Sequence, residues 1–270
     1  MSTEFYRAGV LMIGSLLWDN TKGRKPWREH YFGENFYPNI IDVQVPIRYG
    51  RYSTSRKCPT MVFSQEFLES EKLGVGKFLP LKNQKMAMSE LIFAAKDLSE
   101  AEGSTSRTFL KGGRTKWCII SCLFNNRLLG EKKESFLETW TNNYEQELTS
   151  ELLDNFKMDS EKKSLIDNHG CLNIEWPEPL SSYDLVLTTQ TKPRKTEDDF
   201  SNYLNILELS SEIFKKPEYF IKNKLNGIST ADDAEIIVQL KKKELNAFRK
   251  NAEDNGCLEV EVNRFIQKFL

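Results

Sequence analysis

The chain has 270 residues, 39% of them hydrophobic and 29% charged, which is enough to bury a substantial core. Its 38 basic and 39 acidic residues leave a net charge of −1, which argues against a nucleic-acid-binding protein. No apolar run is long enough to span a bilayer, and the first residues, MSTEFYRAG, do not resemble a signal peptide. We therefore expect a cytoplasmic protein with neither a membrane nor a nucleic acid as partner.

The cysteines are odd in number and scattered, which is typical of reduced thiols and not of a disulfide framework. Cys118 and Cys122 lie in the segment WCIISCLF, which reads as a strand, so we expect both to be buried. The only histidines are His30 and His169, and we expect no zinc site and no other metal site.

The first 125 residues read mostly as strands. After an apolar strand at GVLMI (9–13), the polar stretch 21–39 reads as loop, and residues 40–53 alternate between apolar and polar as one strand does. PTMVFS (59–64) and LGVGKFLPL (73–81) predict two further short strands.

The segment MSELIFAAKDLSEAEG (88–103) changes period. Its apolar residues follow helical spacing, and Gly103 stands where a helix would end. TKWCIISCLF (115–124) returns to strand, 132–156 reads as one amphipathic helix, and YDLVLTTQT (183–191) is one more strand. The rest of the chain is largely helical.

These elements predict an α+β fold with a small mixed β-barrel or a strongly curved sheet and additional helices. The early strands are joined by short connections, whereas a doubly wound parallel sheet needs a helix between most strands. We expect a core over residues 1–125 that is completed by a strand near 183–191, a mainly helical insertion at 126–182, and a helical C-terminal region at 196–270.

The segment VLMIGSLLWDN interrupts an apolar run with Gly14 and Ser15. A strand followed by Gly-Ser can turn sharply and present successive backbone N–H groups to an anion such as a carboxylate. In this interpretation Gly14 lets a ligand approach the backbone and Ser15 adds a hydroxyl. The alternative is an ordinary turn, which this dipeptide more often marks.

Glu102 directly precedes Gly103 at the expected helix end. The negative end of the helix dipole disfavours an ionised carboxylate there, which favours its use as a general base. The alternative is that Glu100 and Glu102 are two solvated acids.

Taken in order, these segments resemble the γ-glutamylcyclotransferase-like superfamily, including its ChaC-type branch. IGSLLW matches the family's Tyr-Gly-Ser motif, which is often followed by Leu-Ile-Trp, except that Ile13 replaces the tyrosine. LSEAEG places Glu102 at the family's general base, and IRYGRYSTSR is similar to its Gly-Tyr-x-Arg-x-Phe strand and the serine-containing stretch that follows. The resemblance covers roughly the first half of the chain.

The resemblance implies an enzyme, a transferase or lyase, that releases an amine or amino acid from a γ-glutamyl-type amide by intramolecular cyclisation. It implies Glu102 as the catalytic base and a small-molecule substrate held by the loop, with no cofactor. The substrate-binding residues are then Ile13, Gly14, Ser15, Leu16 and Leu17. The alternative, favoured by the absent tyrosine, is a catalytically inactive binding or scaffolding module.

The remaining polar residues leave alternatives open. Arg48 and Arg56 can assist an anionic substrate or be exposed strand charges, and only some of Arg48, Arg51 and Arg56 can face a pocket. Trp18 can stack on a substrate or belong to the core. The C-terminal helices can cap the pocket, form a homo-oligomer or bind a protein partner. We expect Asp232 and Asp233 to begin a helix as a solvated pair.

Overall fold

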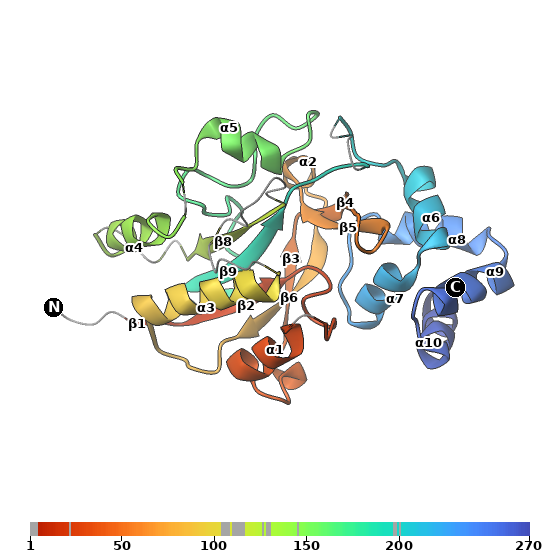
Figure 1. Cartoon of the computed structure of the whole chain (residues 1–270), viewed down its shortest axis with the longest axis horizontal. Helices are drawn as coiled ribbons and strands as arrows, with labels where there is room; N and C mark the ends of the chain where they lie inside the picture. The colour runs from red at the N-terminus through yellow and green to blue at the C-terminus, as the bar shows by residue number, and fades with distance from the viewer. Residues whose placement is uncertain are drawn as a thin grey trace.

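The structure is a computed structural model of the whole chain, and it describes residues 5–21, 23–103, 109, 117–125, 127, 131–144, 146–196, 199 and 201–270. They form an α+β fold around a mixed five-stranded sheet in the order β3-β6-β2-β9-β8 (Figure 1). The strands are β1 Phe5–Tyr6, β2 Ala8–Met12, β3 Ile41–Val45, β4 Ile47–Ser53, β5 Cys58–Phe63, β6 Gly74–Pro80, β7 Met86–Ala87, β8 Cys118–Phe124 and β9 Leu185–Thr191.

Helices surround this sheet. The α-helices in the described part of the chain are α1 Arg24–Phe32, α2 Gln65–Glu69, α3 Met88–Ala101, α4 Glu131–Thr141, α5 Ser150–Leu153, α6 Ile206–Lys215, α7 Glu218–Leu225, α8 Asp233–Lys241, α9 Leu245–Asp254 and α10 Glu259–Phe269. Short 3-10 turns occupy Tyr37–Asn39, Asp154–Phe156 and Glu178–Leu180. No helix among these residues combines the length and apolar character needed to cross a bilayer.

The α+β class and the mixed sheet are confirmed, but the sheet of the described residues is open and does not close into a barrel, because its edge strands are β3 and β8. The two central strands, β2 and β9, run parallel, and the other neighbours are antiparallel. All residues of β2 and β8 are buried, which explains their continuous apolar character. The expected strands at 59–64, 73–81, 115–124 and 183–191 are present, although 115–116 lie outside the described residues.

The predicted single strand over 40–53 is wrong. Pro46 separates β3, which pairs with β6 in the main sheet, from β4, which pairs with β5 in a separate hairpin. Proline has no backbone N–H to continue a ladder, so the chain changes sheets there.

The predicted loop over 21–39 contains helix α1. Its helix buries Trp27 and Phe32 and ends at Gly33, whose φ of 84° glycine adopts without steric strain. The expected long helix over 132–156 is also wrong, because α4 ends at Thr141 and a short helix resumes only after Thr149, whose side chain accepts a hydrogen bond from Leu152 N–H.

The predicted helix over 88–103 is confirmed as α3, with Glu102 at its C-cap and Gly103 next at a φ of 87°. The helices α6 to α10 gather at one side of the molecule, beside the β4–β5 hairpin (Figure 1). On α7, Phe220 packs 5.9 Å from the ring of Tyr49 and 5.8 Å from that of Phe265, so the C-terminal region shares apolar contacts with the hairpin.

The expected acidic helix start lies at α8. Asp233 accepts a 2.7 Å hydrogen bond from the Thr230 hydroxyl and pairs with Lys224 at 3.0 Å. Its side chain is buried and not solvated, so that part of the expectation is wrong. Burial raises the pKa of Asp233, although Lys224 and Thr230 act against this. All five cysteines are free and buried, which confirms the expectation for Cys118 and Cys122.

Candidate functional site

A cavity of about 1410 Å³ opens where the parallel strands β2 and β9 end. Its walls come from the turn after β2, the β4–β5 hairpin, the end of α3, the end of β9 with the segment that follows, and α7. Because parallel strands leave a sheet at the same edge, segments far apart in the sequence meet there.

The Gly14–Ser15 turn forms one wall of this cavity. Leu17 N–H donates to the Gly14 carbonyl at 3.2 Å, and Asp19 N–H donates to the Ser15 carbonyl at 2.8 Å. Within the described part of the chain, the N–H groups of Gly14, Ser15 and Leu16 have no hydrogen-bond partner. Three successive amides are therefore available to an acceptor in the cavity.

Gly14 is glycine because another side chain approaches its backbone. A Cβ added at this position would lie 2.2 Å from the hydroxyl oxygen of Tyr219, a residue of α7 that also lines the cavity. The Tyr219 hydroxyl accepts a 3.3 Å hydrogen bond from Met61 N–H, and burial raises the pKa of Tyr219 to about 12, so the phenol stays protonated at neutral pH. The close approach predicted for a ligand at Gly14 is thus made by this phenol.

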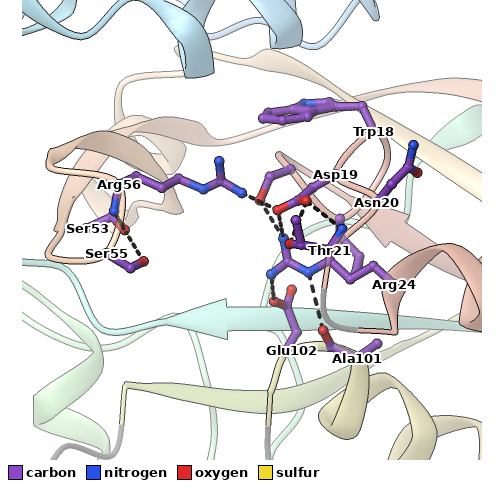
Figure 2. Close-up of polar contacts among 12 residues, drawn as sticks. Trp18, Asp19, Asn20, Thr21, Arg24, Ser53, Ser55, Arg56, Ala101 and Glu102 are labelled. Atoms are coloured by element: carbon purple, nitrogen blue, oxygen red, sulfur yellow. Dashed lines mark hydrogen bonds and ion pairs between the residues drawn. The ribbon is translucent and has the colours of Figure 1, made fainter. Parts of the chain in front are cut away.

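Glu102 lines the same cavity as the Gly14–Ser15 turn. Arg24 of α1 joins the two. Its guanidinium donates to Ser15 Oγ at 3.0 Å. It also donates to Glu102 Oε2 at 2.7 Å (Figure 2). Arg24 Nε also donates to the Ala101 carbonyl at 3.2 Å, so it places positive charge at the negative end of the α3 dipole. The negative end of α3 at Glu102 thus has a counter-charge that comes from α1, 78 positions away in the sequence.

Asp19 is the second carboxylate of this wall. It pairs with Arg24 at 2.9 Å and with Arg56, whose guanidinium reaches it from the β4–β5 hairpin (Figure 2). Burial raises the pKa of Asp19, but hydrogen bonds from Thr21 and the charges of Arg56 and Arg24 outweigh burial and hold that pKa below its usual value. We call Asp19, Arg24, Arg56 and Glu102 the charge-balanced wall, because it holds two cations and two carboxylates.

The other substrate-binding candidates divide between the cavity and the core. Ile13 and Leu16 line the cavity with Gly14 and Ser15, whereas Leu17 is 1% exposed and is absent from the lining. Leu17 therefore contributes to the core packing.

The polar candidates also divide. Arg51, Arg56, Ser53, Ser55 and Trp18 line the cavity. Arg48 does not: it lies 3.9 Å from the ring centroid of Tyr203 and pairs with Glu66 at 2.8 Å. Neither alternative left open for Arg48 describes its position, because it is absent from the cavity lining and, at 8% exposed, is buried.

A second group of cations lines the cavity at the end of β9. We call Arg51, Lys192 and Arg194 the basic cluster. Burial and the neighbouring Arg194 lower the pKa of Arg51 to about 10, and burial, Arg51 and Arg194 lower the pKa of Lys192. The lowered pKa values of Arg51 and Lys192 indicate that the positive charges of the cluster repel one another.

No group of three or more His, Cys, Asp and Glu side chains in the described ranges is placed to hold a metal ion. The site instead offers amide donors, carboxylates and several cations around a cavity, an arrangement suited to binding an anionic molecule and moving a proton.

Asp19, Arg24 and Tyr219 were missed by sequence reasoning. Asp19 and Arg24 follow the Gly-Ser turn within ten residues, and that proximity was the only signal. Tyr219 lies 205 residues beyond Gly14 in the helical region, where nothing in the local pattern points to the turn. Comparison of the chain with protein-family models, with curated proteins and with solved structures found no match in any of the three.

Proposed function

We propose that this chain is a γ-glutamylcyclotransferase-like enzyme, which releases an amine or amino acid from a γ-glutamyl-type amide by intramolecular cyclisation. The observation that carries the proposal is the meeting of Ser15 and Glu102 at one cavity, with Arg24 in contact with both. These residues come from the two motifs, IGSLLW and LSEAEG, on which the resemblance rests. The proposal includes a strongly curved sheet of that family's type, with the later helices as additions.

In the proposed reaction the substrate's own α-amine attacks its γ-carbonyl carbon. Glu102 takes a proton from the α-ammonium group, and the freed nitrogen pair forms the new N–C bond of a five-membered lactam. The C–N bond to the leaving group then breaks as Glu102 returns the proton to the leaving nitrogen. The ring nitrogen passes its second proton through Glu102 to the same nitrogen, which departs as an ammonium group. The products are 5-oxoproline and a free amine or amino acid, so the atoms and charges balance.

The amides of Gly14, Ser15 and Leu16 have the chemistry to hold the substrate's α-carboxylate or carbonyl oxygen, because backbone donors need no reorganisation during the reaction. Arg24 is a positioning residue: its contacts with Ser15 and Glu102 hold the loop and the base in one geometry. Tyr219 supplies a ring and a hydroxyl beside Gly14. The family motif has a tyrosine at the position that Ile13 occupies in this chain.

The test is release of 5-oxoproline from a panel of γ-glutamyl amines and dipeptides. Glu102→Gln keeps the size of the side chain and removes its basicity, so we expect a loss of turnover of about 10²-fold or more. The matched control is Glu100→Gln, because Glu100 is exposed on the same helix and is absent from the cavity lining. Equal turnover in wild type and Glu102→Gln would remove Glu102 from the mechanism.

The second candidate function is a binding module that keeps the cavity without the chemistry. It is favoured by Ile13 at the tyrosine position and by the pairing of Glu102 with Arg24 at 2.7 Å. In that case no member of the panel is turned over by the wild type, but γ-glutamyl compounds still protect the chain against thermal unfolding.

A further inference from the structure

The basic cluster takes no part in the reaction proposed above, yet it lines the same cavity. Its residues come from two segments about 140 positions apart, at the end of β4 and just after β9. Backbone contacts hold these segments together: Tyr52 N–H donates to the Arg194 carbonyl at 2.9 Å, and Arg194 N–H donates to the Gly50 carbonyl at 2.8 Å. The three cations are therefore positioned by the fold.

Side-chain contacts add to this positioning. Arg51 Nη1 donates to the Lys192 carbonyl at 2.7 Å, and its guanidinium lies 5.2 Å from the ring centroid of Trp117. Arg194 Nε donates to the Tyr52 carbonyl at 3.0 Å. Each arginine uses one nitrogen on a carbonyl, which leaves the rest of its planar donor fork for another acceptor.

The two arginines of the cluster have no carboxylate partner in the part of the chain that the structure describes, since neither Arg51 nor Arg194 forms an ion pair with Asp or Glu there. Arg194 lowers the pKa of Arg51, and Arg51 lowers the pKa of Lys192, as neighbouring positive charges do. Like charges held together cost folding free energy, which an anionic ligand would recover.

Two threonines at the end of β9 add polar groups to the same place. Thr189 and Thr191 lie on one face of the strand and line the cavity. Their hydroxyls have no hydrogen-bond partner within the part of the chain that the structure describes, and Thr189 is 8% exposed. Both hydroxyl oxygens are buried in the structure, so they would donate to a bound anion only after rotation about the Cα–Cβ bond, which exchanges a threonine's hydroxyl with its methyl group.

We propose that the basic cluster of Arg51, Lys192 and Arg194 binds a phosphate group, either free or as part of a small phosphorylated molecule. A single carboxylate would neutralise only one of the two arginine charges, whereas a phosphate monoester carries about −1.5 to −2 at pH 7. Phosphate also offers three acceptor oxygens to the arginine forks, a pairing that arginine geometry favours. Phosphate binding does not rest on the proposed function. If that function holds, the phosphate would be part of the amine or amino acid that leaves the γ-glutamyl group.

The experiment is calorimetric titration of the full chain with inorganic phosphate, glycerol phosphate and acetate at equal ionic strength. We expect phosphate to bind at least about tenfold more tightly than acetate. Tighter binding of glycerol phosphate than of inorganic phosphate indicates a phosphorylated small molecule, and the reverse indicates free phosphate. Acetate binding as tightly as phosphate would overturn the proposal.

Variants then locate the binding site. Arg51→Met and Arg194→Met should each weaken phosphate binding by about tenfold or more, whereas Lys241→Met removes an exposed charge of α8 outside the cavity and should change nothing. Thermal unfolding in phosphate-free buffer checks that each variant is folded. If Arg51→Met does not fold, Arg51→Lys replaces it as the test variant, because lysine keeps the charge but lacks the planar donor fork. Wild-type affinity in a folded variant at Arg51 or Arg194 would refute the assignment.

The same titration separates this proposal from the proposed reaction. Glu102→Gln should bind phosphate like the wild type, because Glu102 contacts Arg24 and belongs to the charge-balanced wall. If Glu102→Gln loses turnover but still binds phosphate, the result tests the proposed reaction only. If the arginine variants lose phosphate binding, the result tests the basic cluster only.

Discussion

The charge-balanced wall and the basic cluster line one cavity but differ in how their charges are satisfied. In the first, Arg24 and Arg56 meet Asp19 and Glu102 at ion-pair distance (Figure 2). In the second, described carboxylates form no ion pair with Arg51 or Arg194, and burial and mutual repulsion lower the pKa of Arg51 to about 10. Internal pairing stabilises the first group, whereas the two arginines of the second have no carboxylate partner among the described residues and are suited to an anionic ligand.

This difference separates two uses of arginine in one protein. Arg24 contacts Ser15, Asp19, Ala101 and Glu102, so its removal disturbs several partners at once. Arg51 donates to a backbone carbonyl, lies over the Trp117 ring and is close to Arg194, so its removal relieves repulsion as well as breaking contacts. Equal chemical changes at the two positions should therefore have unequal effects on folding.

The largest effect on stability is expected at Arg24. Arg24→Met removes one of the two cations paired with Asp19 and the arginine paired with Glu102, whose side chains are only 8% and 10% exposed, so we expect a loss of about 3 kcal/mol in the free energy of unfolding. Urea unfolding measures this. Lys25→Met is the control, because its side chain is 60% exposed on the same helix. Equal losses in the two variants would show that the charge-balanced wall does not contribute specially to the free energy of unfolding.

The next effect is expected where α7 meets the turn. The Cβ of Gly14→Ala would overlap the Tyr219 hydroxyl, so we expect a loss of about 2 kcal/mol in urea unfolding. Tyr219→Phe in the same chain removes that hydroxyl and should restore part of the stability. If the double variant is no more stable than Gly14→Ala, the overlap with Tyr219 is not the cause.

A smaller effect is expected from acid at Asp19. Its pKa is below the ordinary 3.8 in the folded chain, so Asp19 stabilises the fold fully above that value and the contribution disappears as pH falls through the folded pKa. Unfolding experiments should therefore show a shallower loss of stability at acid pH in Asp19→Asn than in the wild type. The exposed Asp254→Asn is the control, and an identical acid profile in all three chains would contradict the pairing.

The smallest effect on stability is expected in the basic cluster. Arg51→Met loses the hydrogen bond to the Lys192 carbonyl but relieves repulsion from Arg194, so the free energy of unfolding should change by less than about 1 kcal/mol. Its comparison with Arg24→Met, in phosphate-free buffer and by the same urea method, is the direct measure of the difference between the two groups. A loss as large as that of Arg24→Met would show that both groups are structural.

Local patterns in the sequence predicted much of the secondary structure. The apolar runs of β2, β8 and β9 and the helical spacing of α3 depend on neighbouring residues alone, and all four elements were predicted. The prediction was wrong at Pro46, where a single residue ends one strand. It was also wrong at α1, which lies in a stretch whose polar residues suggested a loop. Tertiary packing of Trp27 and Phe32 favours that helix over its weak local pattern.

For the site, the sequence by itself determined Gly14, Ser15 and Glu102 as candidates, because each stands at the end of an element that its own neighbours define. Only the tertiary structure decided what surrounds them. The Arg24–Glu102 contact spans 78 positions, and the contact of Arg51 with the Lys192 carbonyl spans 141. Such contacts depend on which strands pair, in which direction and in which register, and these properties arise from packing over the whole chain and leave no mark on any one segment.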